Sequence, residues 1–264
     1  MDLGWVVEAA EITAWTDMVR AAPSAVAERF GLEVLELGGA VGLVARRQDS
    51  PEFNRVMGIG LTRPVTASDL EEIASAYRPL GLRHAVLQPS PEAEPVKALP
   101  DLLTAAGYRR VPLDGIKLAR PTLDPPRFAS EFEVIEAEVP DARVFGATIC
   151  AGFGMSADLT PWVSGLVGRP DWRCYLALDD RGPVAAAALY LADHVGWLGL
   201  ATTRADRRGR GVQGALMARR IADAGRAGRG WTVTETTTPA GGAPSRALLQ
   251  AGFSIVHRRA NYAI

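Results

Sequence analysis

Cysteine, histidine and lysine are scarce in this chain of 264 residues. Its two cysteines, Cys150 and Cys174, form no C-x-x-C pattern, and its three histidines lie far apart in the sequence. A disulfide framework needs more cysteines, and a zinc site built from neighbouring residues needs such side chains at short spacings. The sequence therefore predicts no disulfide framework, and we expect no metal site.

A net charge and a long apolar segment are also lacking. The chain has 29 basic and 30 acidic residues, so its net charge is −1. No overall field attracts it to nucleic acid or to an anionic membrane. The longest apolar run, residues 184–192, is far shorter than the roughly 20 residues that span a bilayer, and the first residues contain no basic targeting segment. We expect a cytoplasmic protein with no nucleic-acid or membrane partner.

The composition is that of a globular protein, with 48% hydrophobic and 22% charged residues. The length suits one large domain or two of ordinary size. Residues 120–127 read R-P-T-L-D-P-P-R, and three prolines in so short a stretch disfavour both a helix interior and a central strand. We predict a domain of residues 1–120, a linker of residues 121–127 and a second domain of residues 128–264.

Each half shows strands mixed with helices. The patterns of apolar residues, glycines and prolines predict the following elements. In the first half we expect two strands within 31–46 around Gly38-Gly39, further strands at 54–61 and 82–88, and helices at 70–77 and 99–106. In the second half we expect strands at 132–137, 172–178, 184–192, 195–201, 231–235 and from 253, with helices within 142–167 and at 212–226 and 245–251. The fold class is α/β of the α+β type.

A short internal repeat indicates that the two halves are copies of one fold. Leu102–Tyr108, L-L-T-A-A-G-Y, recurs one residue shorter as Leu248–Phe253, L-L-Q-A-G-F. In both, a helix ends in glycine, which accepts the left-handed conformation, and an aromatic residue opens a strand. The same order of elements precedes each copy, which favours repetition of the whole fold.

The glycine-rich stretch Arg207–Gly214, R-R-G-R-G-V-Q-G, carries the clearest chemistry. Its Gly209-x-Gly211-x-x-Gly214 spacing matches the dinucleotide fingerprint, and Glu235 stands where a ribose-binding acid could follow. In that fold, however, the strand runs almost directly into the first glycine, whereas six mostly polar residues, 203–208, intervene here. Too few residues follow Glu235 to complete the parallel sheet. A NAD(P)-binding protein is therefore the weakest alternative.

The same stretch suits a pyrophosphate cradle. Glycines let the backbone approach a ligand, and the N–H groups of the helix that follows point back at the loop. Arg207, Arg208 and Arg210 add charge for further phosphates. On the helix, apolar residues predict a core face, and Arg219, Arg220, Asp223 and Arg226 are expected to face solvent.

A strand, the motif R-x-x-G-x-[GA], a helix, a strand and a helix ending in A-G-F follow one another here. This order resembles the GCN5-related N-acetyltransferase (GNAT) superfamily, with Arg208–Gln213 as the motif and Gly214 directly after it. Gln213 replaces the small residue usual at the last position. The resemblance covers 132–264 well, and the first half looks like a degenerate copy, because Thr62–Thr66 has no glycine and contains a proline in place of the cradle. It implies two GNAT-like domains in tandem, each a mixed, mostly antiparallel sheet flanked by helices.

The resemblance also implies acetyl-CoA as co-substrate, bound only by the second half. Strands 198–203 and 231–235 would splay apart to admit its pantetheine arm, and a backbone N–H there would polarise the thioester carbonyl. Ser245 lies where this superfamily often has a polar residue on the cofactor, although a plain helix cap explains it equally well. The implied cofactor-binding residues are Ala201, Thr202, Thr203, Arg208, Gly209, Arg210, Gly211, Val212, Gln213, Gly214 and Ser245.

Acetyl transfer to an amine requires a base, because an alkylamine is mostly protonated at neutral pH. Glu235 is the candidate, at the end of a strand beside the cleft; its alternative role is a salt bridge with an arginine. The superfamily often supplies the thiolate with a proton from a tyrosine, but that position is Leu248 here. Tyr262, or else Tyr190, is the substitute we consider, and the thiolate can also leave without a positioned acid.

The sequence does not identify the acceptor amine. Phe153 and Trp162 fall in the region that covers the acceptor pocket in the superfamily, and the neighbouring glycines suit a lid, although a core phenylalanine beside a helix break also fits. We expect a small-molecule or peptide amine, and a homodimer is compatible with the sequence. The function predicted is an acetyl-CoA-dependent N-acetyltransferase, with a non-catalytic acyl-CoA-binding or regulatory module as the alternative.

Overall fold

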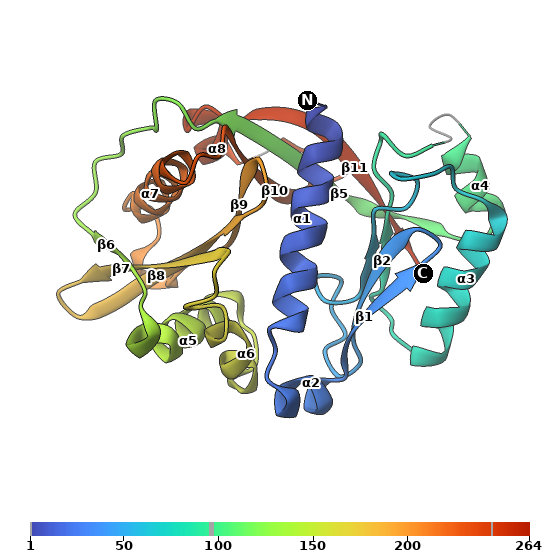
Figure 1. Cartoon of the computed structure of the whole chain (residues 1–264), viewed down its shortest axis with the longest axis horizontal. Coiled ribbons are helices and arrows are strands. Elements are labelled where there is room, and N and C mark those ends of the chain that lie inside the picture. The colour runs from blue at the N-terminus through green and yellow to red at the C-terminus, as the bar shows by residue number, and fades with distance from the viewer. Residues whose placement is uncertain (1, 95–97, 244) are drawn as a thin grey trace.

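One mixed sheet of eleven strands runs through the whole chain in this computed structural model, which describes residues 2–94, 98–243 and 245–264. The strands are β1 (Leu32–Leu37), β2 (Ala40–Ala45), β3 (Arg55–Met57), β4 (Val86–Gln88), β5 (Arg109–Pro121), β6 (Glu133–Glu136), β7 (Trp172–Asp179), β8 (Gly182–Leu191), β9 (Val195–Thr203), β10 (Trp231–Pro239) and β11 (Ser254–Ala263). The helices are α1 (Leu3–Arg20), α2 (Ser24–Phe30), α3 (Ala67–Tyr77), α4 (Leu99–Ala105), α5 (Ala142–Phe153), α6 (Thr160–Ser164), α7 (Val212–Arg226) and α8 (Arg246–Gln250). The helices flank the sheet on both sides (Figure 1).

The strand order is β1-β2-β3-β4-β11-β5-β10-β9-β8-β7-β6, and it corrects the expectation of a separate sheet in each half. The last strand, β11, lies between β4 and β5 of the first half, and β5 pairs in turn with β10 of the second half. Two long strands are thus exchanged at the junction. Hydrophobic periodicity predicts that a segment is a strand but not which strand it pairs with, so the single sheet was not foreseen.

Strand β5 also extends further than the proline pattern suggested. It continues to Pro121, where its register partner is Trp231, and irregular chain follows it. A proline at the last position of a strand removes no interior hydrogen bond of the ladder, so the strand tolerates it there. The division into domains 1–120 and 128–264 stays a prediction.

Helix α1 was not predicted, and it lies across the middle of the molecule between the two halves (Figure 1). Asp2 caps it by accepting hydrogen bonds from the backbone of Gly4 and Trp5 at 2.9 and 3.3 Å. The helix contacts β1 and β2 of the first half and β9 and β10 of the second. Its buried face includes Glu8 and Glu11, so it is not a simple apolar stripe.

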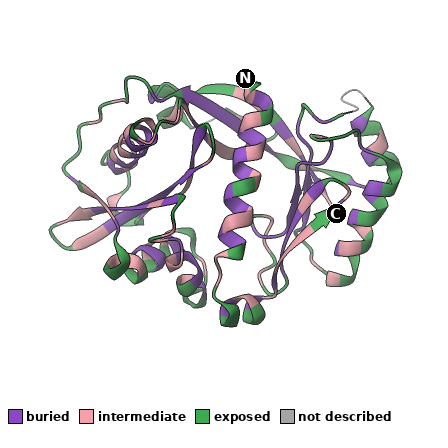
Figure 2. Cartoon of the chain, viewed as in Figure 1, coloured by how far each residue is buried: buried purple, intermediate pink, exposed green. Residues whose placement is uncertain are grey.

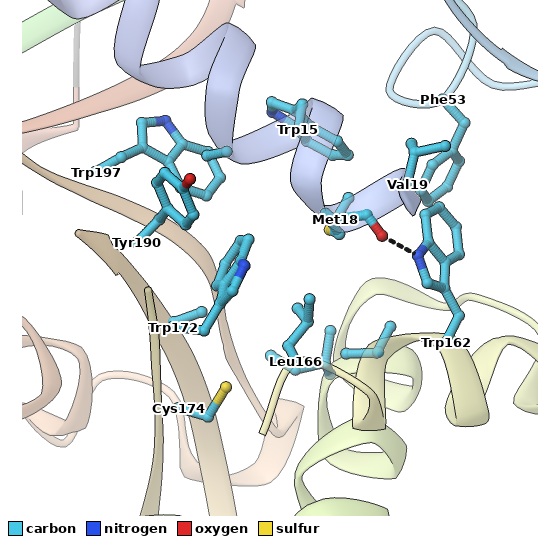
Figure 3. Close-up of a cluster of buried hydrophobic side chains, with 14 of the residues drawn as sticks. Trp15, Met18, Val19, Phe53, Trp162, Leu166, Trp172, Cys174, Tyr190 and Trp197 are labelled. Atoms are coloured by element: carbon cyan, nitrogen blue, oxygen red, sulfur yellow. Dashed lines mark hydrogen bonds between the residues drawn. The ribbon is translucent and has the colours of Figure 1, made fainter. Parts of the chain in front are cut away.

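The buried residues form three hydrophobic clusters. Among the described residues, one cluster fills the first half, a second lies under α7, and the third joins both halves through α1, α5 and α6. Figure 2 shows buried residues on the strands of both halves and along α1. In this third cluster Trp15 makes edge-on contacts with Phe53 and Trp197, at ring-centroid distances of 6.2 and 6.3 Å. Trp162 donates its indole N–H to the carbonyl of Met18 at 2.6 Å (Figure 3). The two halves therefore share one core.

Helix α7 has the predicted bounds but a different polar face. Arg220 and Asp223 are buried, whereas the sequence pattern assigned them to solvent. Asp223 accepts a hydrogen bond from the Tyr175 hydroxyl at 2.7 Å. Arg220 donates only to carbonyl groups, as described below. Buried polar side chains are tolerated when they find such partners, and several of these partners come from other elements. In the described part of the chain, no helix has the length and apolar character needed to cross a membrane.

Candidate functional site

Strands β9 and β10 diverge after a short parallel ladder. Only Trp231–Val233 pair with Val195–Trp197, and beyond them Thr234 reaches β9 by a side-chain bond, its hydroxyl donating to the Leu198 carbonyl at 2.8 Å. Both strands continue for several residues past that point. The predicted splay is present, and it exposes backbone groups of β9 that have no partner on β10.

A bulge interrupts β9 at the start of this splay. Gly199 pairs with Ala188 and Thr202 with Ala186, so two residues of β9 have no partner on β8. One of them, Leu200, has φ of 51°, in the left-handed region that a leucine rarely adopts. Such strain costs about 1–3 kcal/mol and persists where the surrounding structure enforces it, often at functional sites. The bulge turns peptide groups of 199–201 away from the regular ladder.

The buried side chain of Arg220 in α7 hydrogen-bonds to the strands at this bulge. The Arg220 Nη1 atom donates to the carbonyls of Ala188 and Gly199 at 3.1 and 3.3 Å, and Nε donates to Leu216 within α7. Burial lowers the pKa of Arg220 to about 10. The side chain thus ties α7 to the two strands that form the bulge.

The loop before α7 has the conformation expected of a phosphate cradle. Gly209 and Gly211 have φ of 77° and 79°, and Gly211 is the N-cap of α7 with no side chain capping the helix. The first N–H groups of α7 are therefore available at that end. Gln213 donates from its amide to the Thr202 carbonyl at 2.9 Å and to the Thr203 hydroxyl at 2.6 Å, which joins the loop to β9.

Not every residue of the motif faces the loop. A Cβ at Gly214 would lie 2.6 Å from the Phe128 ring, so this glycine permits packing of the segment before β6 against α7. Arg207 is paired with Asp179 and Asp206 at 2.8 and 2.9 Å. Arg210 contacts Glu131 at 2.5 Å, and both side chains are about half exposed. Arg208 and Arg210 are thus the more accessible cations of the loop, whereas Arg207 has a structural role.

The corresponding helix of the first half is closed at its N-terminus. Thr66 caps α3 by accepting a hydrogen bond from the backbone of Asp69, and the Asp69 carboxylate accepts one from the backbone of Thr66 at 2.8 Å. Arg63 binds the same carboxylate through two bonds of 2.8 and 2.6 Å. The bond to Arg63 lowers the pKa of Asp69 well below its usual range. The chain's own carboxylate occupies this helix end, in contrast to α7.

A cavity of about 570 Å³ lies between the halves, in front of the splay. Its walls include residues of α1, β3, β4, α5, α6, β9, β10 and β11. Among the predicted site residues, Glu235, Phe153 and Trp162 line it, together with Leu198–Leu200 of the bulge. The structure thus brings the predicted base and the predicted acceptor residues to one space.

Other predicted residues lie elsewhere. Tyr262 is buried in the core of the first half, on the opposite face of β11 from Asn261 and Ala263, which do line the cavity. Tyr190 packs on Trp172 with ring centroids 5.1 Å apart, and burial raises its pKa. Ser245 is exposed at the start of α8 and makes no capping hydrogen bond there.

Glu235 belongs to a buried cluster of charges that spans both halves. Its Oε2 atom lies 2.6 Å from Lys117 and 2.5 Å from Arg259, whereas Oε1 has only Arg55 nearby, at 4.0 Å. We define the charge cluster as Glu8, Glu11, Arg55, Lys117, Glu235, His257 and Arg259. Of its members, Glu235 has the most exposed side chain, at 17%.

Two acids of this cluster, Glu8 and Glu11, have lowered pKa values and are held in their charged form. Burial by itself raises the pKa of Glu11, but the charges of Arg259, Lys117 and Arg55 outweigh it and lower that pKa well below its usual range. For Glu8, burial is likewise outweighed by Arg259 and Lys117, and the pKa falls to about 2. Burial of charges is tolerated here because each has close partners of opposite sign.

Sequence reasoning missed most of this cluster. Arg55, Lys117 and Glu11 come from three elements of the first half, and no local spacing joins them to Glu235. The available signal was weak: Lys117 is one of only two lysines and stands within an apolar strand pattern. Only the strand exchange around β5 and β11 brings these residues together.

Solved structures provide the comparison, since no protein-family model and no curated protein matches the sequence. A GCN5-related N-acetyltransferase from Kribbella flavida matches with a TM-score of 0.67 and 20% identity, over 99% of this chain and 95% of that one. This chain has the GNAT fold. A GCN5-related N-acetyltransferase from Sphaerobacter thermophilus matches with a TM-score of 0.59 and 20% identity, over 85% of this chain and 80% of that one.

A tandem GNAT protein from the clavulanic acid biosynthesis pathway matches with a TM-score of 0.57 and 13% identity, over 86% of this chain and 78% of that one. At these identities the likeness concerns the fold. Leu248 stands at the position where the resemblance led us to expect a tyrosine, and it packs against the hydrophobic cluster under α7.

Proposed function

We propose that this protein is an acetyl-CoA-dependent N-acetyltransferase whose second half binds the coenzyme. The observation that carries the proposal is the uncapped N-terminus of α7 behind Gly209 and Gly211, joined by Gln213 to the bulged strand β9. A helix end of this kind binds anions, and a splayed strand can pair with an extended ligand through its backbone. The likeness in fold to N-acetyltransferases supports this assignment.

The chain's residues fit such a ligand. The backbone of Gly209–Gln213 would hold the pyrophosphate, with Arg208 and Arg210 available to further phosphates. A Cβ at Gly211 would lie 3.1 Å from the Ala129 carbonyl, a tight contact, and its φ of 79° is one that residues with a side chain rarely adopt, so the position favours glycine. Backbone groups of Ala201 and Thr203 would align the pantetheine arm, and an N–H at the bulge would polarise the carbonyl. When bound, acetyl-CoA supplies an activated acetyl thioester.

Glu235 is the proposed base. Its Oε1 atom lies 4.0 Å from Arg55 and the residue lines the cavity, so we propose that this atom takes a proton from an amine directly or through water. No tyrosine reaches the cavity in the described part of the chain, and a thiolate of ordinary pKa, about 8.5, can leave without a positioned acid. Phe153 and Trp162 would contact the acceptor.

We further infer that the chain consists of two GNAT-like units, of which the first has lost its cofactor site. Asp69 and Arg63 close the α3 helix end that matches the open end of α7. The space beyond the end of β3, which would match the splay beyond the β9–β10 ladder, is occupied by the chain itself. The backbone N–H of Glu94 donates to the Gly60 carbonyl, and the Glu94 carbonyl accepts a hydrogen bond from the N–H of Val65. The first unit contributes Arg55, Lys117 and helix α1 to the cavity and its charge cluster.

A thermal-shift titration tests the assignment. A ligand at 100 times its dissociation constant adds about 2.7 kcal/mol of stability, so CoA and acetyl-CoA should raise the melting temperature while NADH does not. Gly211→Leu should abolish the shift. The matched control is Gly228→Leu, which places the same strained conformation, φ of 78°, at the other end of α7. A shift with NADH alone, or an unchanged CoA shift in Gly211→Leu, contradicts the proposal.

The second candidate is a module that binds acyl-CoA without turnover. Two observations favour it, namely Leu248 at the usual acid position and the pairing of Glu235 with Lys117 and Arg259. Release of free CoA from acetyl-CoA across a panel of amines separates the candidates. An enzyme shows amine-dependent release that Glu235→Gln slows by the roughly 10²- to 10⁴-fold expected of a lost general base. A binding module shows none in either protein.

A further inference from the structure

The cavity joins a polar end to an aromatic wall, and this combination defines a class of acceptor. Arg55 and Glu235 are at the polar end, with Gln88 and Asn261 beside them. The Arg55 guanidinium stacks on the Trp15 ring at 4.0 Å, so the polar end passes directly into the aromatic cluster. There Trp15 lies between Trp197 and Phe53 (Figure 3).

The two charged groups at the polar end, Arg55 and Glu235 Oε1, make no close contact with each other, since they lie 4.0 Å apart. Arg55 is almost fully buried, yet its Nη1 atom has only long contacts, 3.4 Å to Glu11, 3.4 Å to Gln88 and 4.0 Å to Glu235. Its Nε–H has no acceptor among the described residues, and neither has the indole N–H of Trp197, which also borders the cavity. The unmet need at this site is for acceptor oxygens, because both orphans are donors.

The charge balance restricts the ligand further. Apart from His257, the charge cluster holds three carboxylates, Glu8, Glu11 and Glu235, and three basic side chains, Arg55, Lys117 and Arg259. At the cavity rim, Glu52 and Arg83 add one charge of each sign. A polycation or a dianion would upset this balance in a poorly solvated space, whereas a zwitterion leaves it unchanged.

Resting on the proposed function, we infer that the acceptor is an α-amino acid with an apolar or aromatic side chain. The nitrogen and carboxylate oxygens of an α-amino acid are three bonds apart, or roughly 3 Å, which suits the 4.0 Å between Arg55 Nη1 and Glu235 Oε1. Its carboxylate binds the Arg55 guanidinium, whose Nη1 atom has only long contacts within the chain. Its ammonium group faces Glu235, and its side chain packs among Trp15, Trp197 and Phe153.

The reaction balances with the groups present. The amino nitrogen forms a C–N bond to the acetyl carbon as the C–S bond of the thioester breaks, and the electron pair of that bond leaves with sulfur. The ammonium group loses two protons in all. One passes through Glu235 to solvent and the other neutralises the thiolate, so the products are an N-acetylamino acid, free CoA and one proton.

Matched acceptors on the unmodified protein provide the first test. L-phenylalanine, L-tryptophan and L-leucine should be acetylated with a kcat/KM at least about tenfold above that of phenethylamine, which lacks the carboxylate, because a charge-assisted contact is lost. Glycine lacks the apolar body and spermidine adds charge, so both should be poor acceptors. A preference for phenethylamine or spermidine overturns the inference.

A variant locates the carboxylate contact. Arg55→Met should lower kcat/KM for L-phenylalanine at least about tenfold more than it lowers kcat/KM for phenethylamine, because only the first acceptor loses a carboxylate contact. Arg46→Met, which removes a surface arginine paired with Glu33, is the matched control and should preserve the selectivity. An equal loss for both acceptors in a folded Arg55→Met protein contradicts the contact, and the comparison of acceptors on the unmodified protein still decides if this variant does not fold.

Direct binding distinguishes failure of this inference from failure of the proposed function. Isothermal titration of L-phenylalanine into the protein, with 3-phenylpropanoate as the analogue lacking the amine, needs no coenzyme. CoA binding with acetylation of other amines only would leave the N-acetyltransferase standing and reject the amino acid. Absence of a CoA shift would reject the function, while saturable binding of L-phenylalanine at least about tenfold tighter than 3-phenylpropanoate would still support the cavity assignment.

Discussion

The Nη1 atom of Arg220, buried in α7, donates to the carbonyl of Gly199 in β9 at 3.3 Å. The same atom bonds Ala188 in β8, so one side chain fixes both strands at the residue pair where the bulge begins. Leu200 takes up its left-handed conformation directly after this contact. The helix whose N-terminus is proposed to bind phosphate is thereby coupled to the strand proposed to present the oxyanion donor.

Replacing Arg220 should therefore damage both stability and turnover. Arg220→Met removes the donor to the buried Ala188 carbonyl and to the part-buried Gly199 carbonyl, which should cost about 1–3 kcal/mol of unfolding free energy. It should also lower kcat more than it raises KM for acetyl-CoA, because the bulge loses its support. Arg226→Met, on the exposed side of the same helix, is the control. Chemical denaturation and steady-state kinetics measure the effects, and an unaltered kcat in a folded Arg220→Met protein would refute the coupling.

Lys117 joins the two halves through the charge cluster. It contacts Glu11 of α1 and lies 2.6 Å from Glu235 of β10, with all three side chains largely buried. Lys117→Met leaves two carboxylates short of a cation and should cost about 3–5 kcal/mol of unfolding free energy. The double variant Lys117→Met/Glu11→Gln should recover part of that loss, because it removes charge of both signs. Urea denaturation tests this, and strictly additive losses would show that the pair is not coupled.

The same cluster predicts the response of the protein to acid. Glu8 has a pKa of about 2 in the folded protein against 4.5 for an ordinary glutamate, and Glu11 is shifted in the same direction. A lowered folded-state pKa contributes stability that is fully present above pH 4.5 and is lost as the pH falls toward 2. For Glu8 the shift corresponds to on the order of 3 kcal/mol.

Glu8→Gln should therefore flatten the fall of unfolding free energy between pH 4.5 and pH 2. Glu33→Gln, which removes an exposed partner of Arg46, should leave the slope unchanged. Denaturant titrations at a series of pH values measure both slopes. A slope that Glu8→Gln leaves as steep as in the unmodified protein would assign the acid sensitivity to other carboxylates.

Local chemistry explains which elements were predictable. Helix α7 has the predicted bounds because Gly211 begins it and its apolar residues recur at helical spacing, and the Gly38-Gly39 turn correctly separates β1 from β2. The glycines of the loop were also recognised from their spacing. Such features depend on residues close together in the chain.

The missed features depend on distant partners. Helix α1 was overlooked because Glu8 and Glu11 interrupt its apolar face. Both are tolerated because basic side chains from distant parts of the sequence bind them, among them Arg259, at 2.9 Å from each. The sequence pattern assigned Arg220 to solvent because its acceptors in β8 and β9 are distant in the sequence. The exchange of β5 and β11 brings the residues of the charge cluster together, and the periodicity of apolar residues does not specify which strands pair.

Gly199 offers a further test of the bulge, because its lack of a side chain is what lets Trp197 fold back over the strand. A Cβ at Gly199 would lie 1.9 Å from the Trp197 ring, which is buried and would have to leave its position. Gly199→Ala should thus destabilise the protein by about 1–3 kcal/mol and reduce the CoA thermal shift. Trp197→Leu should restore part of the stability in the Gly199→Ala background by removing the clash. Gly230→Ala, where no atom lies within 4 Å of the added Cβ, is the matched control and should be neutral or slightly stabilising. Equal stability of Gly199→Ala and Gly230→Ala would show that β9 does not hold Trp197 in this position.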